Sequence, residues 1–328
     1  MPITSVDKDL NALTMTVVAD FTVPLQRLWD AYCDPRQIER FWGPPTYPAT
    51  FARHDMYPGG RSAYAMTGPD GDVSRGYWEF LAVDAPNSFE VLDGFCHPDG
   101  TPNTGMPSMR MTFAFEATAV GSRQTTTTFF GTLDELEQLT AMGMEEGMRE
   151  AMGQMDAVLA DLRTFAADLP AAVSNLDDTT VRISRVIAGP VEAVWAAHHD
   201  PGLVPRWMLG PDGWTMPLCE TATGVGQRYR YEWESEDGST RFGSTGEVLE
   251  LAAPHREVAT ERMYGDPIPD DAPEARNELT LTAVDGGTLL TYVITYPDTA
   301  TRDGVVGTGM VDGMEISFSR LEQLLVTV

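Results

Sequence analysis

The pattern of apolar and polar positions follows a fixed order along the chain, and that order occurs twice. Two stretches rich in β-branched residues, 13–23 and 180–188, predict opening strands. A proline follows each stretch and is typical of the first turn of a helix. In the first half the next apolar residues recur at helical spacing, at Leu25, Leu28, Trp29 and Tyr32. Each half therefore starts with a strand and a short amphipathic helix.

The rest of each half reads as a meander of strands that ends in a long helix. The pairs Asp34-Pro35 and Asp200-Pro201 predict a side-chain N-cap and the start of a second short helix. Turn signals at 69–71, 236–238 and 285–287 separate runs that predict consecutive antiparallel strands. Long helices are predicted over residues 134–165 and 302–326. Their apolar stripes are Met144, Met148, Met152, Met155, Leu159 and Leu162 on the first, and Met310, Met314, Phe318, Leu321 and Leu325 on the second.

The two halves also repeat each other residue by residue. Residues 21–44 recur as 187–211, with Pro24 matching Pro190 and Trp29 matching Trp195. Because the order is shared over the whole half-chain, we interpret the sequence as a duplicated domain rather than a solenoid array. The predicted organisation is a first domain at 1–165, a linker at 166–178 and a second domain at 179–328, each of the α+β class.

Composition and charge narrow the possible partners. The 328 residues carry a formal net charge of −27, so the average surface repels nucleic-acid phosphates and anionic membrane headgroups. Cys33, Cys96 and Cys219 form no disulfide framework, and the first residues lack the features of a signal peptide. We therefore expect a soluble cytoplasmic protein that binds neither nucleic acid nor membranes; the sequence does not indicate a protein partner.

Strand alternation places several apolar side chains on faces that could enclose a cavity. Ser62, Tyr64 and Met66 alternate on one strand of the first half, and their counterparts are Tyr229, Tyr231 and Trp233. Another strand presents Met109, Met111 and Phe113 on one face. Together with Met144, Met148 and Met152 they predict a methionine-lined interior that adapts to an apolar ligand. The first cavity is expected to be roomier than the second, where Met310 and Met314 line the helix. Plain core packing is the alternative for each methionine.

The motifs together resemble the helix-grip fold of the START and Bet v 1 superfamily. The resemblance rests on the Pro24-to-Trp29 helix, Trp-Gly-Pro at 42–44, Gly-Gly-Arg at 59–61, Pro-Asp-Gly at 69–71 and the terminal Gly-Met helix. It covers both halves and is most similar to the branch named for the C-terminal domain of the activator of the Hsp90 ATPase. It implies two tandem domains, each a curved antiparallel sheet wrapped around a long C-terminal helix, with two short helices after the first strand. Within that branch the chain resembles di-domain proteins of enediyne-type natural-product pathways. It departs from the branch at Gln227, in place of a glycine, and at Met144 and Met310, where tryptophan is common.

Chemistry-bearing residues are few. The five histidines show no metal-ligand spacing, and no phosphate-binding loop is present, so neither a metal nor a cofactor is expected. His97, Tyr64 and the strand residue Glu79, matched by Glu247, remain as weak acid–base candidates. The Pro/Gly-rich segments 94–107 and 265–275 are expected to rim the cavity mouths.

Three functions follow as hypotheses. The first is binding, carriage or sequestration of an elongated hydrophobic molecule such as a polyketide or polyene, in natural-product biosynthesis or self-resistance. The second is a polyketide cyclase or aromatase, and the third, suggested by the Hsp90-activator resemblance, is a chaperone-interaction module.

Overall fold

The computed structural model describes residues 2–161, 169–269 and 271–326 of the chain. The chain divides into two compact units, Met1–Phe165 and Ala166–Val328, and each is described by itself. Each unit contains one eight-stranded antiparallel sheet with helices packed on one face, so the α+β class with tandem helix-grip domains is confirmed.

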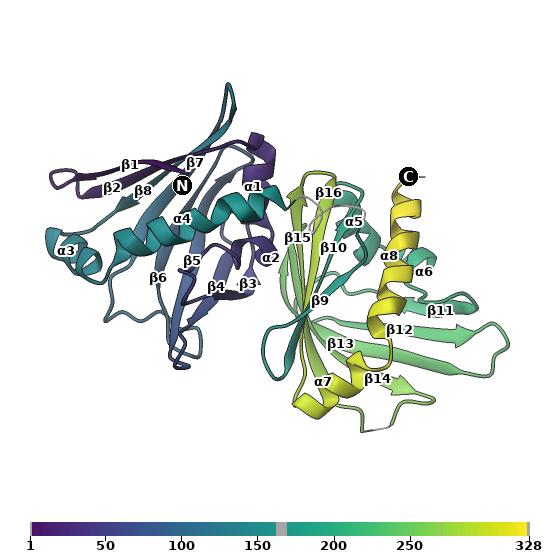
Figure 1. Cartoon of the computed structure of the whole chain (residues 1–328). Coiled ribbons are helices and arrows are strands. Elements are labelled where there is room, and N and C mark those ends of the chain that lie inside the picture. The colour runs from purple at the N-terminus through teal and green to yellow at the C-terminus, as the bar shows by residue number, and fades with distance from the viewer. Residues whose placement is uncertain (1, 162–168, 270, 327–328) are drawn as a thin grey trace. The chain divides into compact units, whose positions relative to one another are not determined.

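The first sheet has the strand order β1-β2-β8-β7-β6-β5-β4-β3. Its consecutive strands β3 to β8 form the predicted meander, and the opening strand β2 closes back onto β8. Figure 1 shows α4 lying across this sheet. The elements are β1 (Ile3–Asp9), β2 (Thr14–Phe21), α1 (Leu25–Cys33), α2 (Pro35–Ile38), β3 (Ala49–His54), β4 (Arg61–Thr67), β5 (Val73–Asp84), β6 (Ser88–Phe95), β7 (Met109–Thr118), β8 (Gly121–Phe129), α3 (Leu133–Ala141) and α4 (Met144–Ala160).

The second sheet repeats this plan with the order β11-β12-β13-β14-β15-β16-β10-β9. In Figure 1 the terminal helix α8 lies across this sheet as α4 does across the first. The elements are β9 (Ala172–Asn175), β10 (Thr180–Ile187), α5 (Val191–His199), α6 (Val204–Trp207), β11 (Trp214–Glu220), β12 (Arg228–Ser235), β13 (Arg241–Ala252), β14 (Arg256–Gly265), β15 (Glu274–Val284), β16 (Gly287–Thr295), α7 (Thr299–Val306) and α8 (Met310–Val326).

Each domain has an edge strand that the sequence analysis did not predict. β1 pairs with β2, and β9 pairs with β10. Since β9 lies within 166–178, the prediction that this whole segment is a linker is wrong: residues 172–175 belong to the second sheet. β1 alternates only weakly in burial, and β9 is only four residues long, so neither segment gave a strand signal. Residues 166–168 of the predicted linker lie outside the described residues.

The long terminal helices are each broken, which corrects the prediction of continuous helices over 134–165 and 302–326. α3 ends before Gly143 and α7 ends before Gly309, and these two glycines have φ angles of 87° and 84°. A left-handed glycine ends a helix because an L-residue with a Cβ adopts this conformation only at a cost. α4 and α8 then begin at the next residue, Met144 and Met310. The predicted end of the first helix, at 162–165, lies outside the described residues.

The two Asp-Pro pairs have different outcomes. Asp34 Oδ1 accepts a hydrogen bond of 2.9 Å from the backbone N–H of Arg36, and Pro35 is the first residue of α2, which confirms the predicted cap. In the second half α6 begins only at Val204, so the prediction that Asp200 caps it is wrong. Asp200 Oδ1 accepts from the N–H of Gly202 at 2.7 Å, the bond that matches Asp34 to Arg36, but here the bond closes a turn that precedes the helix. Gly202 replaces Arg36, and glycine disfavours the helical conformation there.

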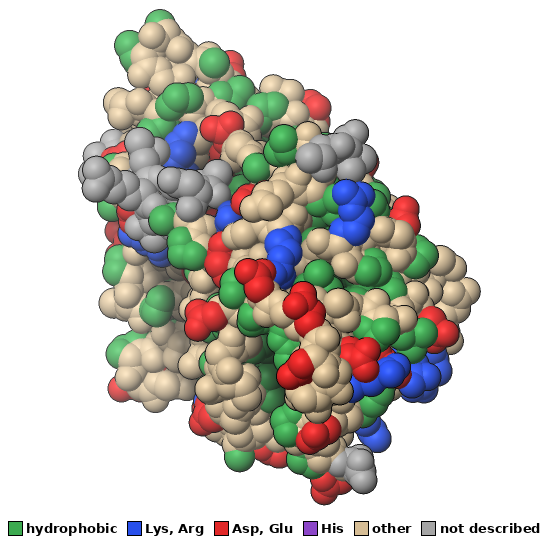
Figure 2. Space-filling model, turned by 90° about the vertical axis from the view of Figure 1, so that its right-hand side faces the viewer, with side chains coloured by type: hydrophobic (Ala, Val, Ile, Leu, Met, Phe, Trp, Pro, Cys, Tyr) green, Lys and Arg blue, Asp and Glu red, His purple; other side chains and the backbone are tan. Residues whose placement is uncertain are grey.

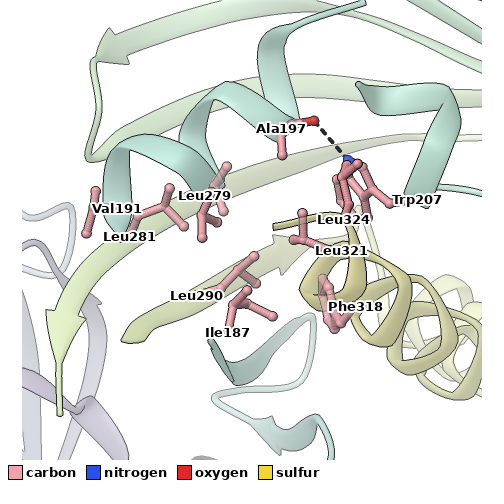
Figure 3. Close-up of a cluster of buried hydrophobic side chains, with 11 residues drawn as sticks. Ile187, Val191, Ala197, Trp207, Leu279, Leu281, Leu290, Phe318, Leu321 and Leu324 are labelled. Carbon is pink, nitrogen blue, oxygen red and sulfur yellow. Dashed lines mark hydrogen bonds between the residues drawn. The ribbon is translucent and has the colours of Figure 1, made fainter. Parts of the chain in front are cut away.

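The cores of the two domains differ in composition. In the first, aromatic rings dominate, and Phe89 stacks on Phe113 with ring centroids 4.4 Å apart. In the second, aliphatic side chains of β10, α5, β15 and β16 pack against Phe318 and Leu321 of α8, as Figure 3 shows. The Trp207 indole N–H donates to the carbonyl of Ala197 at 2.8 Å, which joins α6 to α5 within this core.

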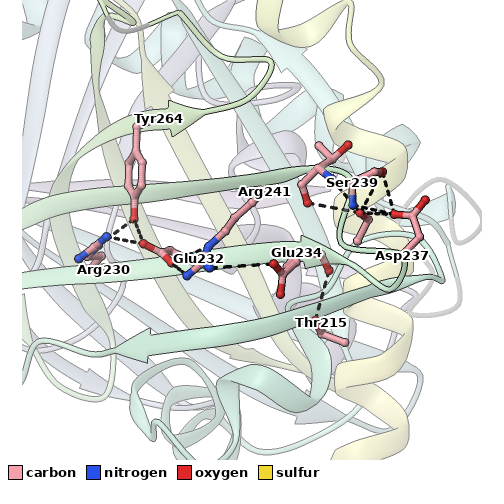
Figure 4. Close-up of polar contacts among 10 residues, drawn as sticks. Thr215, Arg230, Glu232, Glu234, Asp237, Ser239, Arg241 and Tyr264 are labelled. Carbon is pink, nitrogen blue, oxygen red and sulfur yellow. Dashed lines mark hydrogen bonds and ion pairs between the residues drawn. The ribbon is translucent and has the colours of Figure 1, made fainter.

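Charged side chains are paired along the outer face of the second sheet. Glu232 is 5% exposed and accepts hydrogen bonds from Arg230, Arg241 and the hydroxyl of Tyr264 (Figure 4). The Arg241 hydrogen bond is the first cause of the lowered pKa of Glu232. Acidic side chains are spread across the molecular face that Figure 2 presents, rather than gathered in one patch. None of the described helices combines the length and apolar character needed to cross a membrane.

Candidate ligand cavity in the first domain

A cavity of about 380 Å³ lies between the sheet of the first domain and its terminal helices. Its walls are methionine side chains and aromatic rings, with few polar groups. Pockets of this size and composition hold drug-sized ligands in other proteins. The lining comes from the segment after α2 (Phe41, Trp42, Gly43, Pro44), from α1 (Tyr32), from the strands (Tyr64, Met66, Ser74, Arg75, Gly76, Asp93, Phe95, Met109, Met111, Phe113) and from α3, α4 and their junction (Leu139, Met142, Gly143, Met144, Gly147, Met148, Ala151, Met152).

Most of the residues predicted from strand and helix periodicity lie in this wall. Tyr64, Met66, Met109, Met111, Phe113, Met144, Met148 and Met152 all line the cavity. Ser62 is buried but is not among the lining residues, because its hydroxyl hydrogen-bonds to Nδ1 of His54 at 2.8 Å. Tyr64 and Met66 on β4 thus face the cavity, whereas Ser62 belongs to the buried core beside it.

The cavity reaches the surface beside the junction of α3 and α4. Met142 lines the cavity and is also 56% exposed, and the adjoining Gly143 and the strand residue Ser74 are exposed as well. Segment 94–107 was expected to rim the mouth, but only Phe95 of it lines the cavity. The left-handed glycine that breaks the terminal helix thus lies at the mouth.

A carboxyl group that the sequence analysis missed lies in the cavity wall. Asp93 on β6 is 8% exposed, and its Oδ1 accepts hydrogen bonds from the Tyr64 hydroxyl at 3.1 Å and from the Trp78 indole N–H at 2.8 Å. Burial raises the pKa of Asp93 to about 7, although both hydrogen bonds act in the opposite direction. Burial, and next the charge of Asp93, raise the pKa of Tyr64 well above its ordinary value.

Tyr64 reaches Asp93 because a glycine lies beneath its ring. Tyr64 on β4 pairs with Gly76 on β5, and β5 separates β4 from β6. A Cβ added at Gly76 would lie 2.4 Å from the Tyr64 ring and hydroxyl. The absence of a side chain at residue 76 therefore lets the ring cross the neighbouring strand and deliver its hydroxyl to Asp93.

One signal in the sequence could have revealed Asp93. Phe89, Val91 and Asp93 alternate on β6, and all three are buried. An acidic residue that continues an apolar alternation shares the buried face of the strand, so it is a candidate for a buried carboxyl.

The predicted acid–base candidates other than Tyr64 lie outside the cavity lining. His97 is exposed in the loop after β6. Glu79 alternates with the buried residues Trp78 and Phe80 and forms an ion pair with Arg61 at 3.5 Å. Its side chain is 40% exposed on the outer face of the sheet, so a role for Glu79 as a base inside the cavity is wrong on geometric grounds.

In the second domain the predicted residues also face the interior. Tyr229 packs with Ala259 in a small buried cluster, and Tyr231 packs against it. Trp233 donates its indole N–H to the carbonyl of Met208 at 2.7 Å. Met310 and Met314 pack against the buried cluster that contains Ile183 and Tyr296. That the first cavity is the roomier one stays a prediction.

A second, partly buried carboxyl occupies the position that matches Asp93. Glu261 on β14 accepts a hydrogen bond of 2.7 Å from the side-chain amide of Asn277, and burial raises its pKa. Nearby, Glu257 interacts with Nε2 of His199 at 3.0 Å. Among the described residues no group of three or more His, Cys, Asp and Glu side chains is arranged to hold a metal ion.

Comparison with known proteins identifies the family. The family model described as "Activator of Hsp90 ATPase homolog 1-like protein" matches residues 22–160 and 188–326. The chain therefore belongs to this family, with one copy of the domain in each half. Its superfamily commonly binds hydrophobic ligands, as the cavity in the first domain suggests.

Solved structures similar to this chain are about half its length. A crystal structure of a Mycobacterium smegmatis protein is 46% identical, with a TM-score of 0.46, and the match covers 48% of this chain and 97% of that one. A solution structure of an Arthrobacter aurescens protein is 44% identical, with a TM-score of 0.47, and the match covers 48% and 92%. A search of curated proteins found no match.

Proposed function

We propose that the first domain binds a hydrophobic small molecule in the cavity beneath α4, and that the protein carries or sequesters this molecule. The observation that supports this most directly is the cavity of about 380 Å³ walled by methionines and aromatic rings. Polarizable, flexible methionine side chains adapt to an apolar or conjugated ligand. The finer proposal is a polyketide-like or polyene-like cargo in natural-product biosynthesis or self-resistance.

Two matched substitutions on α4 test the site. Ala151 lines the cavity, whereas Ala157 on the same helix is exposed. Ala151→Trp fills part of the cavity and should lower the affinity for the neutral dye Nile red at least about tenfold, while Ala157→Trp should leave it unchanged. Fluorescence titration measures both. Equal saturable binding by both variants, or no saturable binding by the unaltered protein, would contradict the proposal. Native mass spectrometry of protein from its own host would identify the cargo.

A cyclase or aromatase acting on a polyketide is the second candidate, and Asp93 is the observation that favours it. A carboxyl with a pKa of about 7 in an apolar cavity, hydrogen-bonded to Tyr64, has the properties of a general acid–base pair. Turnover of a poly-β-ketone substrate that is lost in Asp93→Asn would support it. If the unaltered protein binds that substrate without turning it over, the cyclase candidate fails and carriage remains.

A further inference from the structure

Asp93 offers one oxygen atom to whatever occupies the cavity. Both of its hydrogen bonds, from Tyr64 and Trp78, end on Oδ1, and no interaction within the described residues engages Oδ2. The residue is more than nine-tenths buried and belongs to the cavity lining. Oδ2 is therefore the oxygen through which Asp93 can accept a hydrogen bond from a ligand, and a donor there offsets part of the cost of burying the carboxylate.

Within the described residues no cationic side chain pairs with this carboxylate. Arg75 is the other charged residue of the lining, and it makes no ion pair with Asp93 in the described residues. Arg75 alternates with Tyr77 and Glu79, whose side chains face outward, on β5. The lining residues of α3 and α4 are methionines, small residues and one leucine.

Aromatic rings surround the same end of the cavity. Trp42 and Tyr64 both line it and pack edge to face with ring centroids 6.1 Å apart. Trp42 also packs against Trp78, the second donor to Asp93, at 4.5 Å. The faces of tryptophan and tyrosine rings attract cations, most strongly where water is excluded. A carboxylate beside such rings forms a cation site rather than a site for an anion.

We propose that the ligand of the first domain is a hydrophobic amine, whose ammonium group donates to Oδ2 of Asp93 between the aromatic rings and whose apolar body lies along the methionine wall. This inference rests on the proposed binding function of the cavity. An ammonium supplies both the missing donor and the missing charge, whereas a hydroxyl supplies only a donor and a carboxylate ligand supplies neither. The net charge of −27 also favours the approach of cations.

The test compares three ligands that share a ten-carbon chain: decylamine, 1-decanol and decanoate. Displacement of Nile red from the full-length protein at pH 8 measures each affinity. We expect decylamine to bind at least about tenfold more tightly than 1-decanol, with decanoate weakest. Asp93→Asn should abolish the preference for the amine and leave 1-decanol unchanged. Glu261→Gln removes the matched carboxyl of the second domain and serves as the control, because it should leave the preference intact.

The pH dependence separates a charge effect from a packing effect. Below about pH 7 the Asp93 carboxylate must first lose a proton, so decylamine affinity should fall by up to about tenfold per pH unit. The other titratable or charged groups near it are Tyr64, Tyr77 and Cys96, whose raised pKa values keep them protonated, Arg75 of the lining, and His54, whose ring nitrogens bond to Ser62 and to the carbonyl of Tyr32. Any pH dependence from His54 would persist in Asp93→Asn.

Equal affinities for decylamine and 1-decanol, or an amine preference that survives Asp93→Asn, would overturn the inference while the cavity proposal stands. If Nile red and all three ligands fail to bind in a saturable way, the cavity proposal itself fails.

Discussion

The inward face of β6 in the first domain carries Phe89, Val91 and Asp93, whereas the matching positions of β14 in the second carry Glu257, Ala259 and Glu261. The last position is a carboxyl in both, but its surroundings differ. Asp93 is bonded by Trp78 and Tyr64, while Glu261 is bonded by Asn277, and Gly246 occupies the position of Trp78. Duplication has therefore preserved an inward-facing carboxyl and has changed the partners that determine what the carboxyl can bind.

The two interiors also differ in which strand carries their buried polar side chains. β8 of the first domain turns Ser122, Gln124, Thr126 and Thr128 inward, all fully buried. The matching strand β16 presents Leu290, Tyr292 and Ile294 to the core of the second domain. In the first domain β6 is the aromatic strand, and in the second β14 is the acidic one. Each domain thus keeps a mixed interior while placing its polar groups on a different strand.

The largest effect is expected when an inward-facing residue of the first domain is replaced by its counterpart from the second. Phe89→Glu introduces the Glu257 side chain where Phe89 stacks on Phe113, and Cys33 stands at the position of His199. The carboxyl then has no cationic partner, and we expect the free energy of unfolding of the first domain to fall by about 4 kcal/mol or more. Hydrogen exchange read separately on peptides of each domain measures this.

The milder substitution Phe89→Leu serves as the control, with an expected cost of about 1–2 kcal/mol. If the amide hydrogens of the first domain stay protected from exchange in Phe89→Glu, its core accepts the polar pattern of the second domain.

The next effect concerns the carboxyl that both domains keep. The pKa of Asp93 is about 7 in the folded protein and about 3.9 in an unfolded chain, so the folded state holds a proton that the unfolded state has lost. Its contribution to stability therefore falls as pH rises from about 4 to about 7 and is level above that. Asp93→Asn removes this loss, and at pH 8 it should stabilise the first domain by a few kcal/mol relative to the unaltered protein.

Denaturant unfolding at pH 5 and pH 8 measures the difference between the two proteins, which should be much larger at pH 8. Glu261→Gln should act in the same direction on the second domain, because burial raises that pKa as well. A stability difference independent of pH would mean that Asp93 is hydrated in the folded state.

The comparison also shows how far sequence reasoning reaches. The duplication followed from residue matches between the halves, and the helix-grip fold from the resemblance of the motifs. The order of the elements and the methionine wall followed from periodicity, because apolar residues at strand or helix spacing must share a face. The burial of Asp93 could have been predicted from its alternation with Phe89 and Val91, but its hydrogen bond from Tyr64 could not, because the Tyr64 ring crosses Gly76 in a contact between strands that no local pattern encodes. The broken terminal helices were missed because glycine is compatible with both a helix interior and a left-handed end. The strand β9 was missed because pairing with β10, rather than its own composition, makes it a strand.

A smaller effect tests whether the Tyr64 crossing is what distinguishes the interior of the first domain from that of the second. Ser244 pairs with Tyr231 as Gly76 pairs with Tyr64. Gly76→Ser should push the Tyr64 ring from Asp93 and destabilise the first domain by about 1–3 kcal/mol. Ser244→Gly introduces no clash, so it should cost about 1 kcal/mol or less, mainly through the backbone freedom that glycine adds. Thermal unfolding of both variants measures the two losses of stability. Equal losses would argue against a special role for Gly76.

The smallest effects distinguish the break in the terminal helix from the helix itself. Gly143, at a φ of 87°, and Gly153, inside α4, both have open space where a Cβ would lie. Gly143→Ala should nevertheless destabilise the first domain by about 1–2 kcal/mol, because alanine is strained in the left-handed region. Gly153→Ala should stabilise it by about 0.5–1 kcal/mol through helix propensity. Since the steric surroundings are alike, opposite signs in denaturant unfolding can arise only from the backbone. Gly309→Ala should repeat the loss in the second domain, and a gain at Gly143 would instead indicate that α3 and α4 prefer to join into one helix across the cavity mouth.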